Sequence, residues 1–188
     1  MKLKYIKKRK SVLYSLSLLF ISVSCVEISQ RERELTEVLN KSVQVEMLQT
    51  IHQGNNTLSF SDLKQRYKYI SIVYLKDGCS PCYPKFTEWL NKINLISRPE
   101  NYAVLFVIHA ASFNAFFRES SDFEKLTGCY FAFLDTENKF LNSNSDIPGW
   151  IFESSFMIND KNEIKMVGPP FFNNDFTAVF HKVVNFHD

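Results

Sequence analysis

Residues 69–82 decide the fold, and they read Tyr69-Ile70-Ser71-Ile72-Val73-Tyr74-Leu75-Lys76-Asp77-Gly78-Cys79-Ser80-Pro81-Cys82. The first seven are mostly β-branched or aromatic, which predicts a strand buried on both faces. Two cysteines come soon after it. A helical segment is next, from about Pro84 to Ile96, with apolar residues spaced for one helix face. A buried strand that leads through a short turn into a helix is typical of an α/β domain.

The rest of the chain continues this alternation of strands and helices. The further expected elements are a strand at Tyr102–Ile108, a helix near Phe113–Leu126, a strand at Tyr130–Leu134, a polar connection at Asn138–Ser145, a hairpin of Ser154–Ile158 with Glu163–Val167, and a last helix from about Asn174 to Val184. We therefore predict an α/β fold with a central mixed sheet, a parallel core, a C-terminal antiparallel hairpin and helices on both faces.

The segment before the first core strand is less clearly patterned. Its apolar residues suit one helix face, Leu35, Val38, Leu39, Leu48 and Ile51, while Val43–Met47 alternates like a short strand. Residues 53–56 form a turn cluster, and Ser61 with Asp62 is expected to cap a short helix at Leu63–Tyr67.

The first 24 residues have the pattern of a signal peptide. Six basic residues among the first ten precede an apolar run of 12 residues, Val12–Val23, which as a helix rises only about 18 Å and is too short to span a bilayer. Small residues lead to Cys25, which resembles a bacterial lipobox in which Cys25 would carry lipid. Ordinary secretion with a spare thiol is the alternative. We expect an extracytoplasmic protein, lipid-anchored to a bacterial membrane and facing the periplasm or the cell surface.

The expected organisation is a signal peptide at 1–24, a tether and N-terminal element at 25–56, and one domain at 57–188. The net charge of +2 comes from the leader, since cutting it leaves 16 of the 22 basic residues against 20 acidic ones, a charge of −4. A chain of this charge, without a Lys/Arg cluster, offers no electrostatic footprint for nucleic acid, which we exclude as a partner.

The chemistry of the sequence is concentrated in the dithiol Cys79-Ser80-Pro81-Cys82. A helix N-terminus offers unpaired N–H groups and the positive end of the helix dipole, which stabilise a thiolate. Cys79 is expected to be the nucleophile. Because three positions separate the cysteines, Cys82 can attack a mixed disulfide on Cys79 and resolve it. This exchange needs neither a metal nor an organic cofactor.

Two other uses of the cysteine pair are less favoured. A structural zinc site needs four ligands, and only His109 and Cys129, both distant in sequence, could complete one. A static disulfide would close too small a loop to stabilise the chain much. The sequence from Leu75 to Cys82 also lacks the Pro-x-x-x-Thr-x-x-Cys motif that peroxiredoxin chemistry requires, which disfavours peroxidase activity.

From Thr57 to about Val184 the sequence resembles the thioredoxin-like proteins of the membrane-anchored, TlpA-like thiol-disulfide oxidoreductase group. The dithiol matches the active site of that group, and Ser155-Phe156-Met157-Ile158-Asn159 is similar to its Thr-Phe-Leu-Ile-Asp hairpin. The resemblance implies exchange of disulfides with client proteins, with electrons from an upstream donor. Ser80, Pro81, Glu153 and His109 are then possible neighbours of the catalytic pair.

Three positions depart from the group's pattern. Glu153 stands where the group has a cis-proline beside the dithiol, Gly78 replaces the aromatic residue before the first cysteine, and Pro84 comes soon after Cys82. Glu153 could face the dithiol or solvent. Pro84 leaves open whether the helix begins at Ser80 or further on. The Glu153 substitution also supports an alternative function, a non-catalytic thioredoxin-like module that binds a partner protein.

Overall fold

The computed structural model of the protein describes residues 29–92, 99–119 and 121–185. The chain divides into two units, Met1–Arg33 and Glu34–Asp188. In the first, Ser29 and Glu32 form a capping box that begins helix α2, Gln30–Val38: the Ser29 N–H donates to Glu32 Oε2 at 2.8 Å and the Glu32 N–H to Ser29 Oγ at 3.3 Å.

The expected signal peptide and Cys25 lie outside the described residues. Among the helices that are described, none is both long and apolar enough to cross a membrane. The sheet and the dithiol both belong to the second unit.

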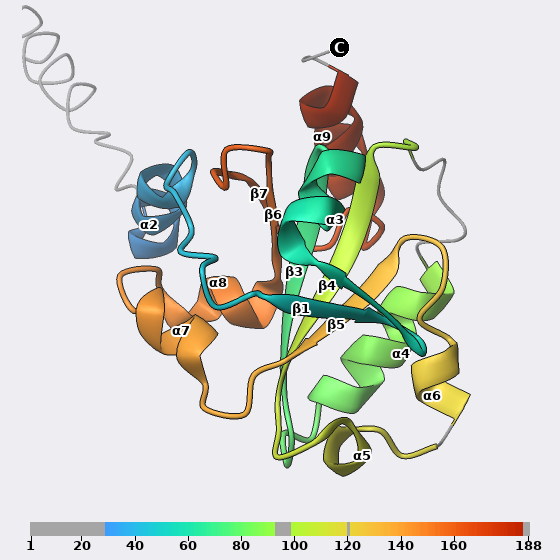
Figure 1. Cartoon of the computed structure of the whole chain (residues 1–188). Coiled ribbons are helices and arrows are strands. Elements are labelled where there is room, and N and C mark those ends of the chain that lie inside the picture. The colour runs from blue at the N-terminus through green and yellow to red at the C-terminus, as the bar shows by residue number, and fades with distance from the viewer. Residues whose placement is uncertain (1–28, 93–98, 120, 186–188) are drawn as a thin grey trace, which may run out of the picture. The chain divides into compact units, whose positions relative to one another are not determined.

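The second unit is built on a seven-stranded sheet in the order β2-β1-β5-β4-β3-β6-β7 (Figure 1). Its core is parallel, since β4 pairs in parallel with both β3 and β5, and hairpins close the two sides. The strands are β1 Thr50–Gln53, β2 Asn56–Ser59, β3 Tyr69–Lys76, β4 Tyr102–His109, β5 Tyr130–Leu134, β6 Phe156–Ile158 and β7 Ile164–Val167. The predicted parallel core and C-terminal hairpin are confirmed; the hairpin of β1 and β2 was not foreseen.

Side chains alternate between two buried layers along the central strands. Val73 and Phe106 face helices α4, Cys82–Lys92, and α9, Asn174–Asn185. Ile72 and Leu105 face the opposite layer, which contains the helices α3 Phe60–Arg66, α7 Lys139–Ser143 and α8 Gly149–Ser154. Because both faces are covered, the strands are continuously apolar rather than alternating with polar residues. The predicted helices on both faces are therefore present.

Several local predictions were wrong. The helix expected near Phe113–Leu126 is two short helices, α5 Phe113–Phe116 and α6 Ser121–Glu124, because Phe117 is extended, with φ −73° and ψ 134°. Helix α3 is capped by Ser59, not Ser61: its hydroxyl accepts from the Asp62 N–H at 3.1 Å. Residues 43–47 form no strand, and only Ser42 makes an isolated bridge, to Glu163.

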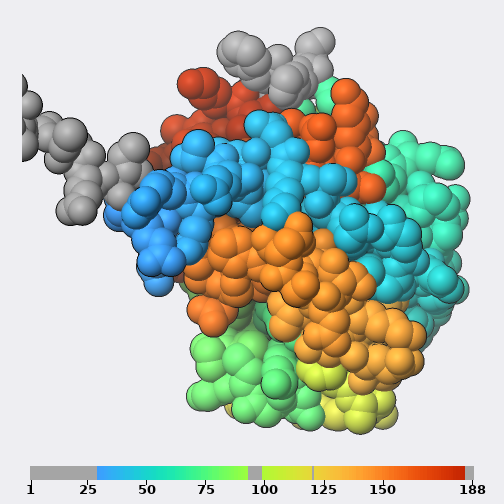
Figure 2. Space-filling view, turned by 90° about the vertical axis from the view of Figure 1, so that its left-hand side faces the viewer, coloured from blue at the N-terminus to red at the C-terminus, as the bar shows by residue number. Residues whose placement is uncertain are grey.

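Residues 34–49 are held to the C-terminal half of the chain by main-chain bonds. The Asn40 N–H donates to the Ile164 carbonyl at 2.7 Å and the Ile164 N–H to the Lys41 carbonyl at 2.9 Å, so this segment pairs with the outer edge of β7 at its first residue. Asn144 of the turn after α7 exchanges two bonds with the main chain of Gln44. Figure 2 shows the resulting surface, with the blue and cyan segment lying against the orange one. The sequence assigned residues 34–53 to a separate N-terminal element. In the structure they pack directly on the sheet or belong to it.

Candidate functional site

The dithiol lies at the carboxyl edge of the sheet, one turn after β3. Gly78 makes this turn with a left-handed φ of +72°, a conformation that side chains other than glycine rarely adopt. The Asp77 carboxylate accepts from the Gly78 N–H at 2.8 Å and the Lys76 carbonyl accepts from the Cys79 N–H at 3.3 Å. The absence of an aromatic residue at 78 is therefore explained by the backbone turn that presents Cys79.

Cys79 and Cys82 form a disulfide, with their Cα atoms 5.4 Å apart. Cys79 is partly exposed, whereas Cys82 is buried, with 9% of its surface exposed. Of the two cysteines, Cys79 is therefore the one more open to a visiting molecule.

Helix α4 begins at Cys82, which answers the question that Pro84 raised. The Cys82 N–H donates to the Cys79 carbonyl at 3.1 Å and the Lys85 N–H donates to the Pro81 carbonyl at 3.0 Å. Pro84 is the third helical residue, where an N–H would have no helical partner, so it costs the helix no bond. Cys79 remains one turn before a helix of 11 residues, close to its positive end.

A cavity of about 240 Å³ opens beside Cys79, between the β3–α4 turn and the segment around α5. Its lining residues are Lys76, Asp77, Gly78, Cys79, Ser80, Tyr83, Ala115, Phe116 and Arg118. The Arg118 guanidinium lies over the Tyr83 ring, 4.6 Å from its centroid. The cavity thus combines the accessible sulfur with an aromatic wall and two cationic side chains.

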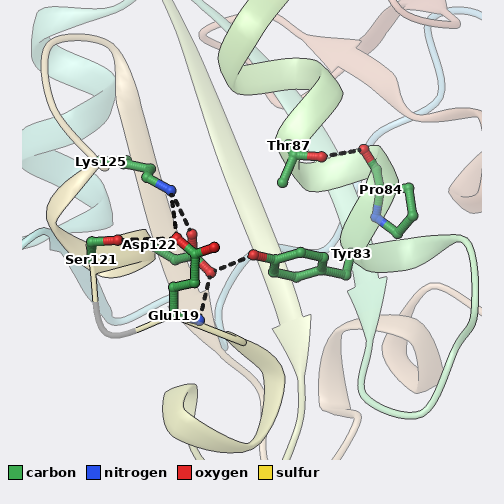
Figure 3. Close-up of polar contacts among 7 residues, drawn as sticks. All are labelled: Tyr83, Pro84, Thr87, Glu119, Ser121, Asp122 and Lys125. Atoms are coloured by element: carbon green, nitrogen blue, oxygen red, sulfur yellow. Dashed lines mark hydrogen bonds and ion pairs between the residues drawn. The ribbon is translucent and has the colours of Figure 1, made fainter.

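A polar network fixes the Tyr83 wall (Figure 3). The Tyr83 hydroxyl reaches from α4 toward α6 and donates to Asp122 Oδ2 at 2.8 Å. Asp122, fully buried, also accepts from Lys125 Nζ at 2.9 Å and from the Glu119 N–H at 3.1 Å. Burial opposes the charge of Asp122, but the bonds from Lys125, Tyr83 and Glu119 prevail and hold its pKa below the ordinary value.

Glu153, the residue at the cis-proline position, lies in the last turn of α8 and is exposed. It lines a different cavity, with Lys85 and Trp89, and is not among the residues that line the cavity at Cys79. Its carbonyl accepts from Lys85 Nζ at 2.7 Å. Burial lowers the pKa of Lys85 to about 8, although the nearby Glu153 carboxylate acts in the opposite direction.

His109 ends β4 beside Lys76, at the same sheet edge as the dithiol, but it does not line the cavity at Cys79. Its Nδ1 lies 2.9 Å from the Asp135 carbonyl, and since a carbonyl only accepts, Nδ1 carries the hydrogen. Ser80 and Pro81 are exposed residues of the turn between the cysteines. Cys129 is a buried thiol at the start of the β5 segment. Across residues 29–92, 99–119 and 121–185, no three His, Cys, Asp or Glu side chains are grouped to hold a metal ion.

Sequence reasoning missed Tyr83, Arg118, Asp122 and Lys85. The only available signal was local: Glu119, Asp122 and Lys125 recur at three-residue spacing, which indicates side chains on one side of a turn or helix. The sequence gives no means of pairing them with Tyr83, which lies 39 residues from Asp122.

No family model matches the sequence, and no curated protein matches it. Solved structures do resemble the fold. The thioredoxin domain of a thiol-disulfide oxidoreductase from Bacteroides vulgatus is 16% identical, with a TM-score of 0.50 over 80% of this chain and 98% of that one. A thiol:disulfide interchange protein from a Bacteroides species is 18% identical, with a TM-score of 0.50 over 73% of this chain and 86% of that one.

A proposed electron transport protein from Aquifex aeolicus is 14% identical, with a TM-score of 0.54 over 78% of this chain and 99% of that one. At these identities the likeness concerns the fold alone. A parallel core closed by an antiparallel hairpin, with a disulfide between β3 and α4, agrees with it. The protein has a thioredoxin-like fold.

Proposed function

We propose that the protein is a thiol-disulfide oxidoreductase that exchanges disulfides with client proteins through Cys79 and Cys82. The observation that carries the proposal is the unequal exposure of a disulfide at the start of α4, with Cys79 accessible and Cys82 buried. Two of the structures that share this fold are thiol-disulfide oxidoreductases from Bacteroides, which supports the proposal.

In the proposed reaction the reduced protein supplies two electrons. The Cys79 thiolate attacks one sulfur of a client disulfide, that bond breaks, and the other client sulfur leaves as a thiolate that takes up a proton. Deprotonated Cys82 then attacks Cys79, which forms the Cys79–Cys82 disulfide and releases the second client thiol. An upstream dithiol donor restores the reduced state. The opposite direction, oxidation of client dithiols, uses the same steps in reverse.

The decisive test is a trapping experiment with the reduced protein. We expect Cys82→Ser to accumulate a mixed disulfide on Cys79 when it meets a disulfide-bonded client, because the resolving thiol is missing. Non-reducing gels and mass spectrometry measure the adduct, and Cys129→Ser is the control that should behave like the wild type. Adducts that persist in Cys79→Ser, or none in Cys82→Ser, would contradict the assignment.

A non-catalytic binding module is the second candidate, and the place of Glu153 favours it. The cis-proline position is occupied by an exposed helical residue whose carbonyl accepts a hydrogen bond from Lys85, so the surface at this position differs from that of the group. A wild-type protein that binds a partner with equal affinity in both redox states, and reduces no disulfide, would support the module over the enzyme.

We further propose that the domain is displayed outside the cytoplasm by a lipid on Cys25. The basic leader, the short apolar run and the small residues before Cys25 support this. Metabolic labelling of cells with a fatty acid should mark the wild type, while Cys25→Ala should remain unlabelled and keep its leader. Equal labelling of both proteins would refute the anchor.

A further inference from the structure

The cavity beside Cys79 is cationic. Two of its lining side chains, Lys76 and Arg118, are positively charged, and only Asp77 is negative. At about 240 Å³ it is smaller than the 300 Å³ or more of typical ligand pockets, so it suits one side chain rather than a whole ligand.

The position of Arg118 is fixed through Tyr83. The guanidinium rests on the Tyr83 ring, and the Tyr83 hydroxyl is bonded to Asp122, a carboxylate with no exposed surface. A cation on the face of an aromatic ring is attracted to the π electrons. An aromatic side chain anchored at its far end therefore holds the guanidinium at the rim of the cavity.

The acidic groups that follow Arg118 in the chain are bonded to Lys125 and Tyr83, and Asp77, which lines the cavity, is bonded within its own turn. Glu119 Oε2 lies 3.5 Å from Lys125 Nζ, and Asp122 accepts from Lys125 and Tyr83. The Asp77 carboxylate accepts from the Gly78 N–H. Within the described part of the chain, Arg118 is exposed and lies within 4 Å of no carboxylate oxygen. Its planar fork of donors remains open to a carboxylate from outside.

We propose that this cavity binds the carboxylate of an acidic residue that flanks the reacting cysteine of a client, with Arg118 as the specificity-determining residue. The inference rests on the proposed disulfide exchange and names its substrate class, peptide disulfides with Glu or Asp beside the cysteine. The carboxylate stays on Arg118 while Cys79 attacks the neighbouring sulfur.

The test compares two synthetic peptide disulfides that differ only in the residues flanking cysteine, Glu in one and Gln in the other. For the reduced wild type at low salt, we expect kcat/KM to be about two- to fivefold higher for the Glu peptide, as one exposed ion pair provides. This ratio should fall toward one in Arg118→Gln, and also toward one when salt screens the charges. Arg118→Lys, which keeps the charge, should retain part of the preference.

Arg66→Gln is the matched control. Arg66 is an exposed arginine before the first residue of β3, whereas Cys79 comes after the last, and eight strand residues span about 26 Å. Its removal should leave the Glu-to-Gln ratio at the wild-type value. Because the ratio compares two peptides on one protein, a change in the thiolate fraction of Cys79 cancels.

A ratio of one in the wild type, or a preference that Arg118→Gln retains, would overturn the inference and leave the exchange function intact. If Arg118→Gln does not fold, a peptide flanked by Lys tests the charge preference of the whole cavity, Lys76 included, with the wild type alone, and Arg118→Lys tests the guanidinium. The expected order is then Glu above Gln above Lys, and any other order counts against the inference. If the wild type reduces neither of the two peptides and also fails to reduce the small neutral bis(2-hydroxyethyl) disulfide, the proposed function itself is refuted.

Discussion

At the level of single residues, the turn at Gly78 disfavours other amino acids because of its backbone conformation and not because of lack of space. A Cβ placed there meets no atom within 4 Å, yet φ is +72°. We expect Gly78→Ala to lower the free energy of unfolding by about 1 kcal/mol, because an L side chain destabilises a left-handed backbone.

Gly149 provides the control for this prediction. It is the first residue of α8, has equally open space around a built Cβ, and lacks a left-handed φ. Gly149→Ala should be neutral or slightly stabilising, because alanine favours a helix more than glycine does. Urea unfolding of the two variants measures the difference, and equal losses at both sites would refute the backbone argument.

A second prediction at the level of single residues concerns the Tyr83 hydroxyl. Tyr83→Phe removes the donor at 2.8 Å from a fully buried Asp122 carboxylate. An under-satisfied buried acceptor costs about 1–3 kcal/mol, so we expect a loss of that size in the free energy of unfolding at pH 7. Tyr67→Phe is the comparison, since its hydroxyl makes only a long bond of 3.4 Å to the Gly128 carbonyl. A loss at Tyr67 as large as that at Tyr83 would contradict the network.

At the level of elements, Lys85 joins the dithiol helix α4 to the end of α8. Its Nζ donates to the Glu153 carbonyl, and burial lowers its pKa from 10.5 to about 8. Between these two values the unfolded chain binds a proton that the folded chain has lost. The free energy of unfolding should therefore gain a positive slope with pH in this window from Lys85.

Thermal or urea unfolding between pH 8 and pH 10.5 measures this slope in the wild type and in Lys85→Met. The difference between the two curves isolates Lys85 from the other groups that titrate in this range. We expect the variant to lose part of the rise. Parallel curves would mean that folding does not lower the pKa of Lys85.

The elements that sequence predicts well are those whose signal is local. Strand β3, and helix α4 as far as Lys92, were correctly expected, because an apolar run and a three-to-four-residue spacing are visible in any short window; the predicted end of the helix near Ile96 lies outside the described residues. The helix over 113–126 was not, because Phe117 leaves the helical conformation and packs against Phe86. The backbone conformation of such a residue is set by tertiary contacts rather than by local helix propensity.

The same distinction holds for the candidate site. The dithiol and its place after β3 were evident from the sequence, and the structure puts His109 at the same sheet edge. Arg118 on Tyr83 and Lys85 on Glu153 join residues 35 and 68 positions apart, which one sequence cannot pair. Glu153 drew attention only through the resemblance, and its place in a helix came from the structure.

At the level of the whole molecule, residues 34–56 are integral to the second unit. Val38, Val43, Leu48 and Ile51 are buried in the layer of α3, α7 and α8, and β1 pairs with β5. We expect a fragment of residues 57–188 to lose cooperative unfolding, because it lacks this apolar surface, worth about 1.5–3 kcal/mol for each large side chain.

A fragment of residues 34–188 is the control and should unfold in one transition. Circular dichroism during heating distinguishes the two. A cooperative transition of equal midpoint in both fragments would show that the N-terminal segment is dispensable.

The segment that pairs with the outer edge of β7 also bears on self-association. At Ile164, the first residue of β7, Asn40 and Lys41 occupy the N–H and C=O groups with which a β-strand from another molecule would pair. The other border, β2, is only four residues long, and its residues are exposed or partly exposed. Short or covered borders are how natural sheets resist edge-to-edge aggregation. A scaffold protected in this way can leave Cys79 partly exposed without offering the borders of its sheet to the strands of other chains.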